Sequence, residues 1–231
     1  EAAEGHVAVV PHGPVFGEYN GVFAFKWGKG LVVTVPERIS KEMASLIGRQ
    51  VKARGVDSVF DSKYLQEVFG TTVDRLIGPA YYGYLSARSE DANFVVPTPE
   101  FETRELGAAD RDRLDQFSGE IGQEDWELSG LDPNRTKHIF GILDPKGSLF
   151  AIAGYENWGQ SIAQVGIVSH PKSRGQGFGK RILDTAIDHA LKVGGKIVQY
   201  RTLRANAPSM QLAFHCGFDD LASSIAIRFK K

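Results

Sequence analysis

The segment best suited to chemistry is a run of glycines and cations that follows an apolar stretch. It lies between a predicted strand at Ile162–Val168 and a predicted helix at Gly179–Val193. Its residues are Arg174, Gly175, Gln176, Gly177, Phe178, Gly179 and Lys180. The N-terminus of a helix offers unpaired backbone N–H groups and partial positive charge to an anion. Glycine carries no Cβ and lets the backbone approach an oxygen closely. The order strand, glycine turn, helix therefore predicts a phosphate-binding cradle.

Two common phosphate-binding motifs do not fit this segment. A P-loop needs four residues between its glycine and the Gly-Lys-Ser/Thr end, but only three separate Gly175 from Gly179, and Arg181 replaces the hydroxyl residue. A dinucleotide-binding motif needs Gly-x-Gly-x-x-Gly followed by an acidic residue about 20 positions on. Here the last glycine comes one position early, and Lys196–Arg204 contains neither Asp nor Glu.

The remaining match is the pattern Arg/Gln-x-x-Gly-x-Gly/Ala, filled by Arg174, Gly177 and Gly179. The flanking matches are Ser169–Gly175, Asn206–Ser209, Leu212 and Gly217-Phe218. Over Ile162–Phe218 the chain resembles the GCN5-related N-acetyltransferase (GNAT) superfamily, whose members bind the acetyl-CoA pyrophosphate at this loop. The resemblance is weaker over the rest of 104–231 and absent from 1 to about 99. It implies transfer of an acetyl group from acetyl-CoA, as co-substrate, to a small-molecule or peptide amine.

The resemblance also implies which residues hold the cofactor. In the family, the strand before the loop splays from its neighbour, and its free backbone groups pair with the pantetheine arm. The implied positions are Ile167, Val168 and Ser169 for the arm, Arg174 to Lys180 for the pyrophosphate, and Asn206 for a hydrogen bond to the arm. Asn206 is also suited to cap the helix that follows it, and the side chains of Ile167 and Val168 are suited to a core strand.

Acetyl transfer needs a neutral amine, so one group must accept the ammonium proton and another must protonate or tolerate the thiolate. The family often supplies the acid as a tyrosine seven residues after the Asn206 position, but Ala213 stands there. Tyr200, on a predicted strand at Ile197–Thr202, is the substitute candidate. It also suits a structural role in that strand, and a CoA thiolate can leave without an acid.

The family's usual base is also missing, because Gln164 lies near the position where the family commonly has a glutamate. We predict Glu156, at the end of the neighbouring strand, and Glu124 as candidates, acting directly or through water. Asp125 and Glu127 are further candidates, and each of these carboxylates also suits a solvated surface. Trp126 and Trp158 are candidates for walls of an acceptor pocket or for core packing.

These departures leave two functions open. The first is a direct-transfer N-acetyltransferase, because no activated Cys or Ser is evident for an acyl-enzyme. The second is a CoA-binding sensor or regulatory module that has lost catalysis, as the loss of ionisable groups at Ala213 and Gln164 would allow.

Charge is distributed unevenly along the chain. The formal net charge is −1, so no global basic field favours nucleic acid or an anionic membrane as a partner. Glu100–Asp132 holds eleven acidic residues against three arginines, and Pro171–Arg204 holds eight cations against two aspartates. The acidic segment predicts attraction of a cationic amine, although two solvated helix faces would give the same pattern.

The surrounding elements predict an α/β fold with a mixed, mainly antiparallel sheet flanked by helices. Pro97 and Pro99 predict a linker between a small α/β domain at 1–97 and an acetyl-CoA-binding domain at 98–231. The first domain is expected to contain a hairpin and two helices, the second three successive antiparallel strands before the glycine loop. The predicted ranges are Val22–Trp27, Leu31–Val35, Glu37–Arg54, Ser62–Phe69, His138–Leu143, Ser148–Tyr155 and Ile162–Val168.

The remaining signals concern environment and metals. A single cysteine, Cys216, expected to pack in the core, and the lack of a leader pattern favour the cytoplasm. The apolar runs are too short for a membrane span.

The histidines show no ligand spacing, so no metal is expected. They are His6, His12, His138, His170, His189 and His215. A homodimer is a further prediction for partners.

Overall fold

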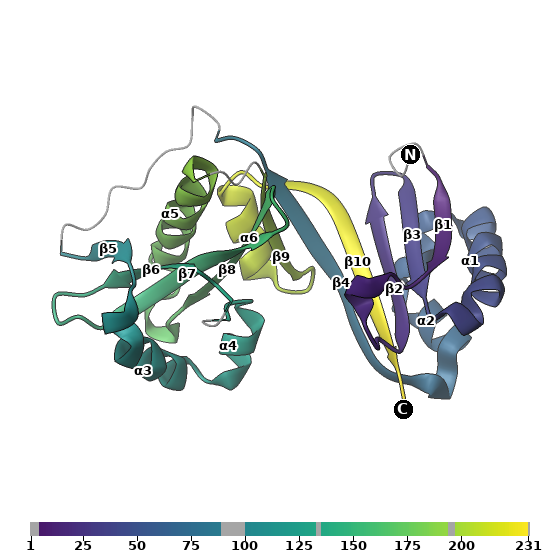
Figure 1. Ribbon diagram of the computed structural model, residues 1–231, viewed down its shortest axis with the longest axis horizontal. Coiled ribbons are helices and arrows are strands. Elements are labelled where there is room, and N and C mark those ends of the chain that lie inside the picture. The colour runs from purple at the N-terminus through teal and green to yellow at the C-terminus, as the bar shows by residue number, and fades with distance from the viewer. Residues whose placement is uncertain (1–4, 89–99, 133–134, 194–196, 231) are drawn as a thin grey trace. The chain divides into compact units, whose positions relative to one another are not determined.

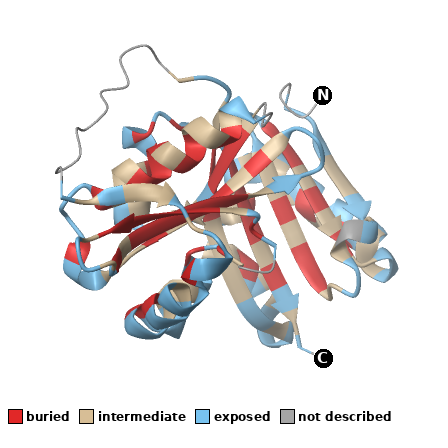
Figure 2. Ribbon diagram, turned by 60° about the vertical axis from the view of Figure 1, so that its left-hand side comes forward, coloured by how far each residue is buried: buried red, intermediate tan, exposed pale blue. Residues whose placement is uncertain are grey.

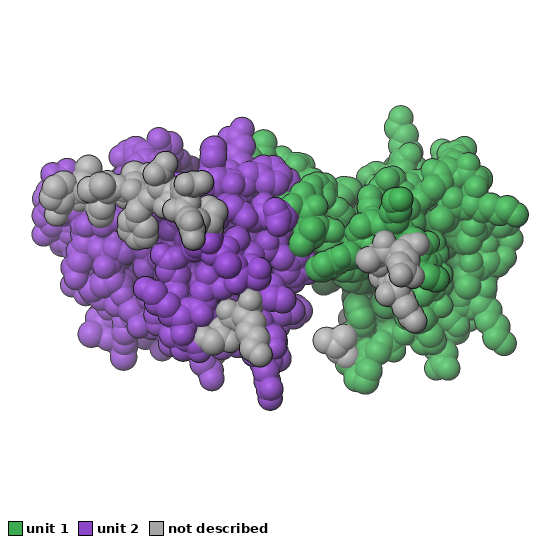
Figure 3. Space-filling model, turned by 90° about the horizontal axis from the view of Figure 1, so that it is seen from above, with its two compact units in different colours: residues 1–82, 202–207, 220–231 green, residues 83–201, 208–219 purple. Residues whose placement is uncertain are grey.

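The structure is a computed structural model that describes residues 5–88, 100–132, 135–193 and 197–230. It has an α/β fold built from two compact units (Figure 3). The first unit comprises Glu1–Tyr82, Thr202–Ala207 and Asp220–Lys231, and the second comprises Gly83–Arg201 and Pro208–Asp219. The chain therefore passes more than once from one unit to the other.

The first unit is a sheet with helices. Its described strands are β1 (Val7–Pro11), β2 (Gly21–Trp27), β3 (Gly30–Val35), the first part of β4 (Val73–Leu85) and most of β10 (Asp219–Phe229), in the order β1-β3-β2-β10-β4. Its helices are α1 (Ser40–Arg54) and α2 (Ser62–Phe69) (Figure 1). The predicted hairpin is confirmed, since β2 and β3 pair antiparallel up to Trp27 and Gly30.

Both predicted helices of this unit are confirmed. A 3-10 turn at Glu37–Ile39 leads into α1. At α2, the Asp61 carboxylate accepts hydrogen bonds from the backbone N–H groups of Lys63 at 2.8 Å and Tyr64 at 3.4 Å. These bonds satisfy N–H groups that the first turn leaves unpaired, so the helix begins after Asp61.

The second unit has a mixed, mainly antiparallel sheet, as predicted. Its described strands follow the order β9-β8-β7-β6-β5, and only the β8–β9 pair is parallel. The strands are β5 (Glu102–Glu105), β6 (His138–Leu143), β7 (Leu149–Trp158), β8 (Ile162–Ser169) and β9 (Ile197–Leu203). The helices are α3 (Arg111–Ile121), α4 (Gln123–Leu128), α5 (Phe178–Lys192) and α6 (Ala207–His215). The predicted strands from His138 to Val168 are confirmed.

The core of this unit lies on both faces of the sheet. On one face, Phe117 and Ile121 of α3 pack against Ile152 and Val168. On the other face, α5 buries an apolar stripe that includes Ile182, with the buried strands between the two helix layers (Figures 1 and 2). Apolar positions three to four apart give α5 this stripe. The sheet therefore fixes where β8 ends and where α5 begins.

The predicted domain boundary stays a prediction, because Val96 to Pro99 lie outside the described residues. The two compact units do not coincide with the predicted domains 1–97 and 98–231, because each unit contains segments from both ranges. Strand β10 pairs antiparallel with β2, from Ala222 opposite Trp27 to Arg228 opposite Gly21, and this pairing gives the end of the chain to the first unit. None of the helices among the described residues is long and apolar enough to span a membrane.

Candidate functional site: a glycine loop and a free strand edge

Strand β8 loses one of its two neighbours before it ends. Its parallel pairing with β9 runs from Ile162 opposite Ile197 to Val165 opposite Tyr200 and includes no later pair among the described residues. Its antiparallel pairing with β7 continues to Ser169, opposite Ala151. Backbone groups on the β9 side of 166–169 are therefore outside the β ladder. This is the geometry expected for an edge that binds an extended, amide-bearing arm.

The loop after α4 reaches this edge. The Ile167 N–H donates a hydrogen bond of 3.1 Å to the Ser129 carbonyl oxygen. A Cβ on Gly166 would lie 2.7 Å from the same oxygen, so glycine is required for this close approach. Val168 is buried in the core while its backbone continues the strand. The sequence carries no signal for this contact, because Ser129 is remote along the chain.

The glycine loop begins at a turn tied to the sheet. Ser173 Oγ donates to the Phe150 carbonyl oxygen at 2.7 Å, and His170 Nδ1 accepts the Lys172 N–H at 3.1 Å. Gly175 and Gly177 have φ angles of 77° and 83°, values that side chains rarely adopt, and a Cβ at either would meet no heavy atom within 4 Å. The two glycines allow a backbone with positive φ angles, and the positions where their Cβ atoms would lie are open space.

The backbone N–H groups from Gly175 to Lys180 belong to this loop and to the first turn of α5. Among the described residues, no N–H group from Gly175 to Lys180 donates to a backbone carbonyl. The first such bond of the 15-residue helix α5 is from Arg181 N to Gly177 O, at 3.1 Å. A helix start with free N–H groups attracts anions through those donors and through the helix dipole. The residues present therefore fit a diphosphate.

Gly179 brings this helix start against the end of β8. A Cβ on Gly179 would lie 3.3 Å from Ser169 Oγ, tighter than ordinary contact. Gly179 therefore allows close packing against β8, and it does not adopt a left-handed conformation. Gln176 Nε2 donates to the Lys172 carbonyl oxygen at 2.9 Å, which turns its side chain back onto the loop.

The two cations predicted to bind the pyrophosphate are held by carboxylates of the chain. Arg174 Nη2 lies 2.6 Å from Asp125 Oδ2 of α4, and Lys180 Nζ lies 2.6 Å from Asp184 Oδ2 within α5. Asp184 also pairs with Arg88 at 2.8 Å. Asp125, a candidate base in the sequence, is thus engaged with the loop.

Glu156 and Gln164 stand opposite each other on β7 and β8. The Glu156 carboxylate lies 3.1 Å from Arg135 Nε and accepts a 2.7 Å hydrogen bond from the Trp158 indole N–H. Gln164 Oε1 is buried and has no hydrogen-bond partner in the part of the chain that the structure describes. Gln164 also faces Gln199 of β9, so the three side chains form a polar row on one face of the sheet.

Tyr200 lies on the other face, since neighbours along a strand point in opposite directions. It is 2 % exposed, its hydroxyl lies 2.6 Å from Ser209 Oγ of α6, and burial raises its pKa to about 12. This environment suits the structural interpretation of Tyr200, and we do not retain it as the acid. Ala213, at the family's tyrosine position, is also fully buried.

The other predicted residues are placed as follows. Glu124 is exposed on α4, and Glu127 accepts a hydrogen bond from Gln123. Trp126 packs partly against the α3 core, which matches the core alternative, whereas Trp158 is 46 % exposed. Asn206 directly precedes α6, and its proposed contact with the cofactor stays a prediction.

The comparisons with known proteins agree with this geometry. A model of the acetyltransferase (GNAT) family matches residues 102–218, and a search of curated proteins found no match. Among solved structures, the chain is similar to a GNAT-family acetyltransferase from Colwellia psychrerythraea, at 18% identity over 85% of this chain and 75% of that one, with a TM-score of 0.53. The chain is also similar to a GCN5-related N-acetyltransferase-like protein from Streptococcus suis, at 20% identity over 73% of this chain and 67% of that one, with a TM-score of 0.50.

A third similar structure is a tandem GNAT protein from the clavulanic acid biosynthesis pathway, at 10% identity over 72% of this chain and 57% of that one, with a TM-score of 0.52. At these identities the likeness concerns the fold alone. The family model leaves residues 1–101 unmatched but covers slightly more than half of the 231 residues. The chain belongs to the acetyltransferase (GNAT) family.

Proposed function

We propose that this protein is an N-acetyltransferase that moves an acetyl group from acetyl-CoA to a primary amine by direct attack. The observation that carries the proposal is the segment from Gly175 to Lys180, where no N–H group donates to a backbone carbonyl among the described residues, beside the edge of β8 that β9 does not cover. Donors in that order fit a diphosphate followed by an extended arm with amides of its own.

The binding roles follow from the backbone. The N–H groups from Gly175 to Lys180 hold the two phosphates, and the arm runs along the edge from Ile167 to Ser169, where Val168 keeps its partner on β7. The arm must replace the Ser129 carbonyl as partner of the Ile167 N–H. Loss of that internal bond is offset by a bond of the same kind to the ligand.

The catalytic roles centre on the Glu156 and Gln164 pair. Bound acetyl-CoA supplies an acetyl thioester. The amine nitrogen forms the C–N bond as the C–S bond breaks, and the amine gives up one proton. We assign its acceptor to Glu156, which Arg135 and Trp158 hold in place. The Gln164 oxygen, which has no hydrogen-bond partner among the described residues, accepts a hydrogen bond from the amine and orients its lone pair. The thiolate takes its proton from solvent.

A covalent acyl-enzyme is not part of the proposal. The only cysteine, Cys216, is 3 % exposed, and burial raises the pKa of its thiol to about 12. A thiol in that state is a poor nucleophile. We place the reaction in the cytoplasm, as the single cysteine favours a reducing compartment.

The acceptor that we propose is a cationic amine. Part of the acidic segment is neutralised within the chain, because Asp110 pairs with Arg104 and Arg113, and Asp125 pairs with Arg174. Exposed carboxylates such as Glu124 remain to attract a cation. Cationic amines should therefore react faster than anionic ones, and the advantage should shrink with added salt.

The test compares two glycine variants. Gly177→Glu places a carboxylate in the cradle, and Gly159→Glu is its matched control, because Gly159 also has a positive φ and open space around it. We expect Gly177→Glu to abolish acetyl-CoA binding in calorimetry and thiol release with amines, while both variants melt at similar temperatures. Wild-type affinity in Gly177→Glu would refute the placement of the cofactor.

The second candidate is a CoA-binding sensor without turnover. One observation favours it, namely that the Ile167 N–H already bonds to Ser129 in a closed loop. Tight acetyl-CoA binding without thiol release across cationic, neutral and anionic amines would support the sensor, and turnover with any of them supports the enzyme.

A further inference from the structure

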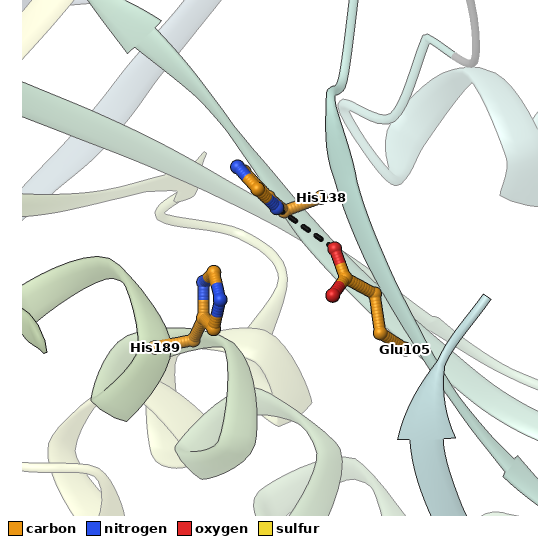
Figure 4. Close-up of side chains that lie close together, drawn as sticks. All are labelled: Glu105, His138 and His189. Atoms are coloured by element: carbon orange, nitrogen blue, oxygen red, sulfur yellow. Dashed lines mark hydrogen bonds and ion pairs between the residues drawn. The ribbon is translucent and has the colours of Figure 1, made fainter. Parts of the chain in front are cut away.

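A cluster of metal-binding side chains lies away from the glycine loop. Glu105 of β5, His138 of β6 and His189 of α5 each offer one ligand atom, and these atoms all lie within 4.8 Å of one another. Figure 4 shows His189 reaching from the helix toward the two side chains on the strands. The three come from three elements, so no spacing motif in the sequence could reveal them.

Hydrogen bonds and ring contacts hold the two imidazoles in place. Tyr155, 3 % exposed, has its hydroxyl 2.9 Å from His189 Nδ1, and its ring stacks on His138 with centroids 5.1 Å apart. The Tyr155 hydroxyl can accept the proton of the Nδ1–H tautomer of His189. His189 then presents Nε2 as its ligand atom. Histidines that bind metals are commonly oriented by such a second contact.

The Glu105 carboxylate and the C-terminal end of α5 place negative charge beside the two imidazoles. Glu105 Oε1 lies 2.8 Å from His138 Nδ1, so these two atoms already share a proton that a metal ion would replace. His189 lies in the last turn of α5, where the helix dipole favours a cation. The apolar ring of Phe140 packs against the His189 ring, with their centroids 5.1 Å apart.

The geometry points to a new binding site for a borderline divalent transition-metal ion such as Zn²⁺, formed by Glu105, His138 and His189. Two imidazoles and one carboxylate are typical ligands for such ions, whereas Mg²⁺ and Ca²⁺ prefer oxygen alone. Zinc bonds of about 2.0–2.1 Å place tetrahedral ligands roughly 3.3 Å apart, so modest side-chain rotations close the site around the ion.

The site would act as a structural clamp. Strand β5 has four residues and forms the edge of the sheet in its unit, next to β6. A metal ion would join β5 and β6 to the last turn of α5, the helix whose first turn forms the phosphate cradle. Three protein ligands leave one position of a tetrahedral ion, which water would fill. This inference does not depend on acetyl transfer, and its test does not measure activity.

The experiment titrates the full chain, made without a histidine tag, with Zn²⁺. We expect one equivalent to bind in calorimetry and to raise the melting temperature. His138→Gln or His189→Gln should each weaken binding by at least about tenfold and remove the rise in melting temperature. His170→Gln is the matched control, because His170 also has a nearby carboxylate, Glu120 at 3.5 Å, but lies outside the cluster.

Three results of the zinc titrations would overturn the proposal. They are binding of less than one equivalent, unchanged affinity in His189→Gln, and equal loss in His170→Gln. A measurement on the wild-type chain covers the case in which a cluster variant does not fold. Cu²⁺ bound at the site should show electron paramagnetic hyperfine structure from two imidazole nitrogens, and a spectrum without them rejects the site.

Discussion

The Ile167 N–H donates a hydrogen bond to the Ser129 carbonyl oxygen over 3.1 Å, just beyond the point where β8 parts from β9. A buried N–H group needs a partner, and a β8 amide that β9 no longer meets finds one in this loop. The proposed pantetheine arm needs the same donor. Under this proposal the cofactor and the loop compete for the Ile167 N–H group.

Cofactor binding should consequently change the partner of Ile167. We expect the amide signal of Ile167 to shift strongly during a CoA titration followed by nuclear magnetic resonance, together with signals from 129–131. Val168 pairs with Ile152 on β7 and should move less. An Ile167 signal that stays in place at saturating CoA would mean that the arm does not run along this edge.

The ion pair between Asp125 and Arg174 makes a second prediction. Asp125 holds the loop arginine at 2.6 Å and places a negative charge beside the cradle. Asp125→Asn should tighten CoA binding, because it frees Arg174 for phosphate and removes a repulsive charge. An exposed pair is worth about 0.2–1 kcal/mol, so the dissociation constant should fall by a few-fold at most. Calorimetry at low salt measures it.

Asp112→Asn is the control for that change, since Asp112 is an exposed carboxylate in the same acidic segment. It alters the net charge equally but lies on α3, apart from this ion pair. If both variants tighten CoA binding equally, the change in net charge is the cause, and the release of Arg174 from its ion pair is not.

The proposed base makes a third prediction. Glu156→Gln keeps the side-chain volume but removes the proton acceptor, so kcat should fall by roughly 10²–10⁴-fold while the affinity for acetyl-CoA is unchanged. Glu124→Gln tests the rival carboxylate on α4. The variant with the larger loss in kcat identifies the base, and equal small losses would exclude both.

Much of the local structure could be predicted because the signals are local. The turn Asp144–Gly147 separates two apolar runs, and the Asp144 carboxylate accepts the N–H groups of Lys146 and Ser148 at 2.9 and 2.8 Å. The start of α2 follows equally from one capping residue, Asp61. The glycine loop was identifiable for the same reason, since its conformation depends on residues within a single turn.

Contacts between remote segments could not be predicted. Gly21 pairs with Arg228, and a Cβ on Gly21 would lie only 1.9 Å from the Ile227 carbonyl oxygen, yet neither residue signals the other in the sequence. The segment Gly78–Tyr84 contains two glycines and Pro79, residues typical of turns, yet it lies within the 13-residue strand β4. The clustering of His138 with His189 is hidden in the same way.

Asp110 gives a prediction for stability. Its carboxylate is 5 % exposed, accepts two hydrogen bonds from Arg104 at 2.7 and 2.8 Å, and accepts the Gly107 N–H at 3.0 Å. Arg104 first, and then Gly107, lower the pKa of Asp110 well below its usual 3.8. A lowered pKa stabilises the fold above pH 3.8, and this contribution is lost as the pH falls below that value.

Asp110→Asn should therefore reduce the free energy of unfolding by about 2 kcal/mol at pH 7. The difference from wild type should shrink at pH 3 and below. Urea unfolding followed by circular dichroism at both pH values measures it, with Asp112→Asn as an exposed control. A difference that is constant with pH would show that the ionised carboxylate is not what stabilises this turn.

Cys216 connects the fold to the choice of mechanism. Burial first, and then the charge of Asp184, raise the pKa of the Cys216 thiol to about 12, so the thiol stays protonated at the pH of an assay. A disulfide reagent should leave the native chain unlabelled during an assay and label one thiol per chain in urea, so colour formed with an amine measures released CoA. Cys216→Ala should retain turnover, since direct transfer needs no enzyme nucleophile. Turnover lost in a folded Cys216→Ala variant would instead require an acyl-enzyme on a residue that the structure buries at 3 % exposure.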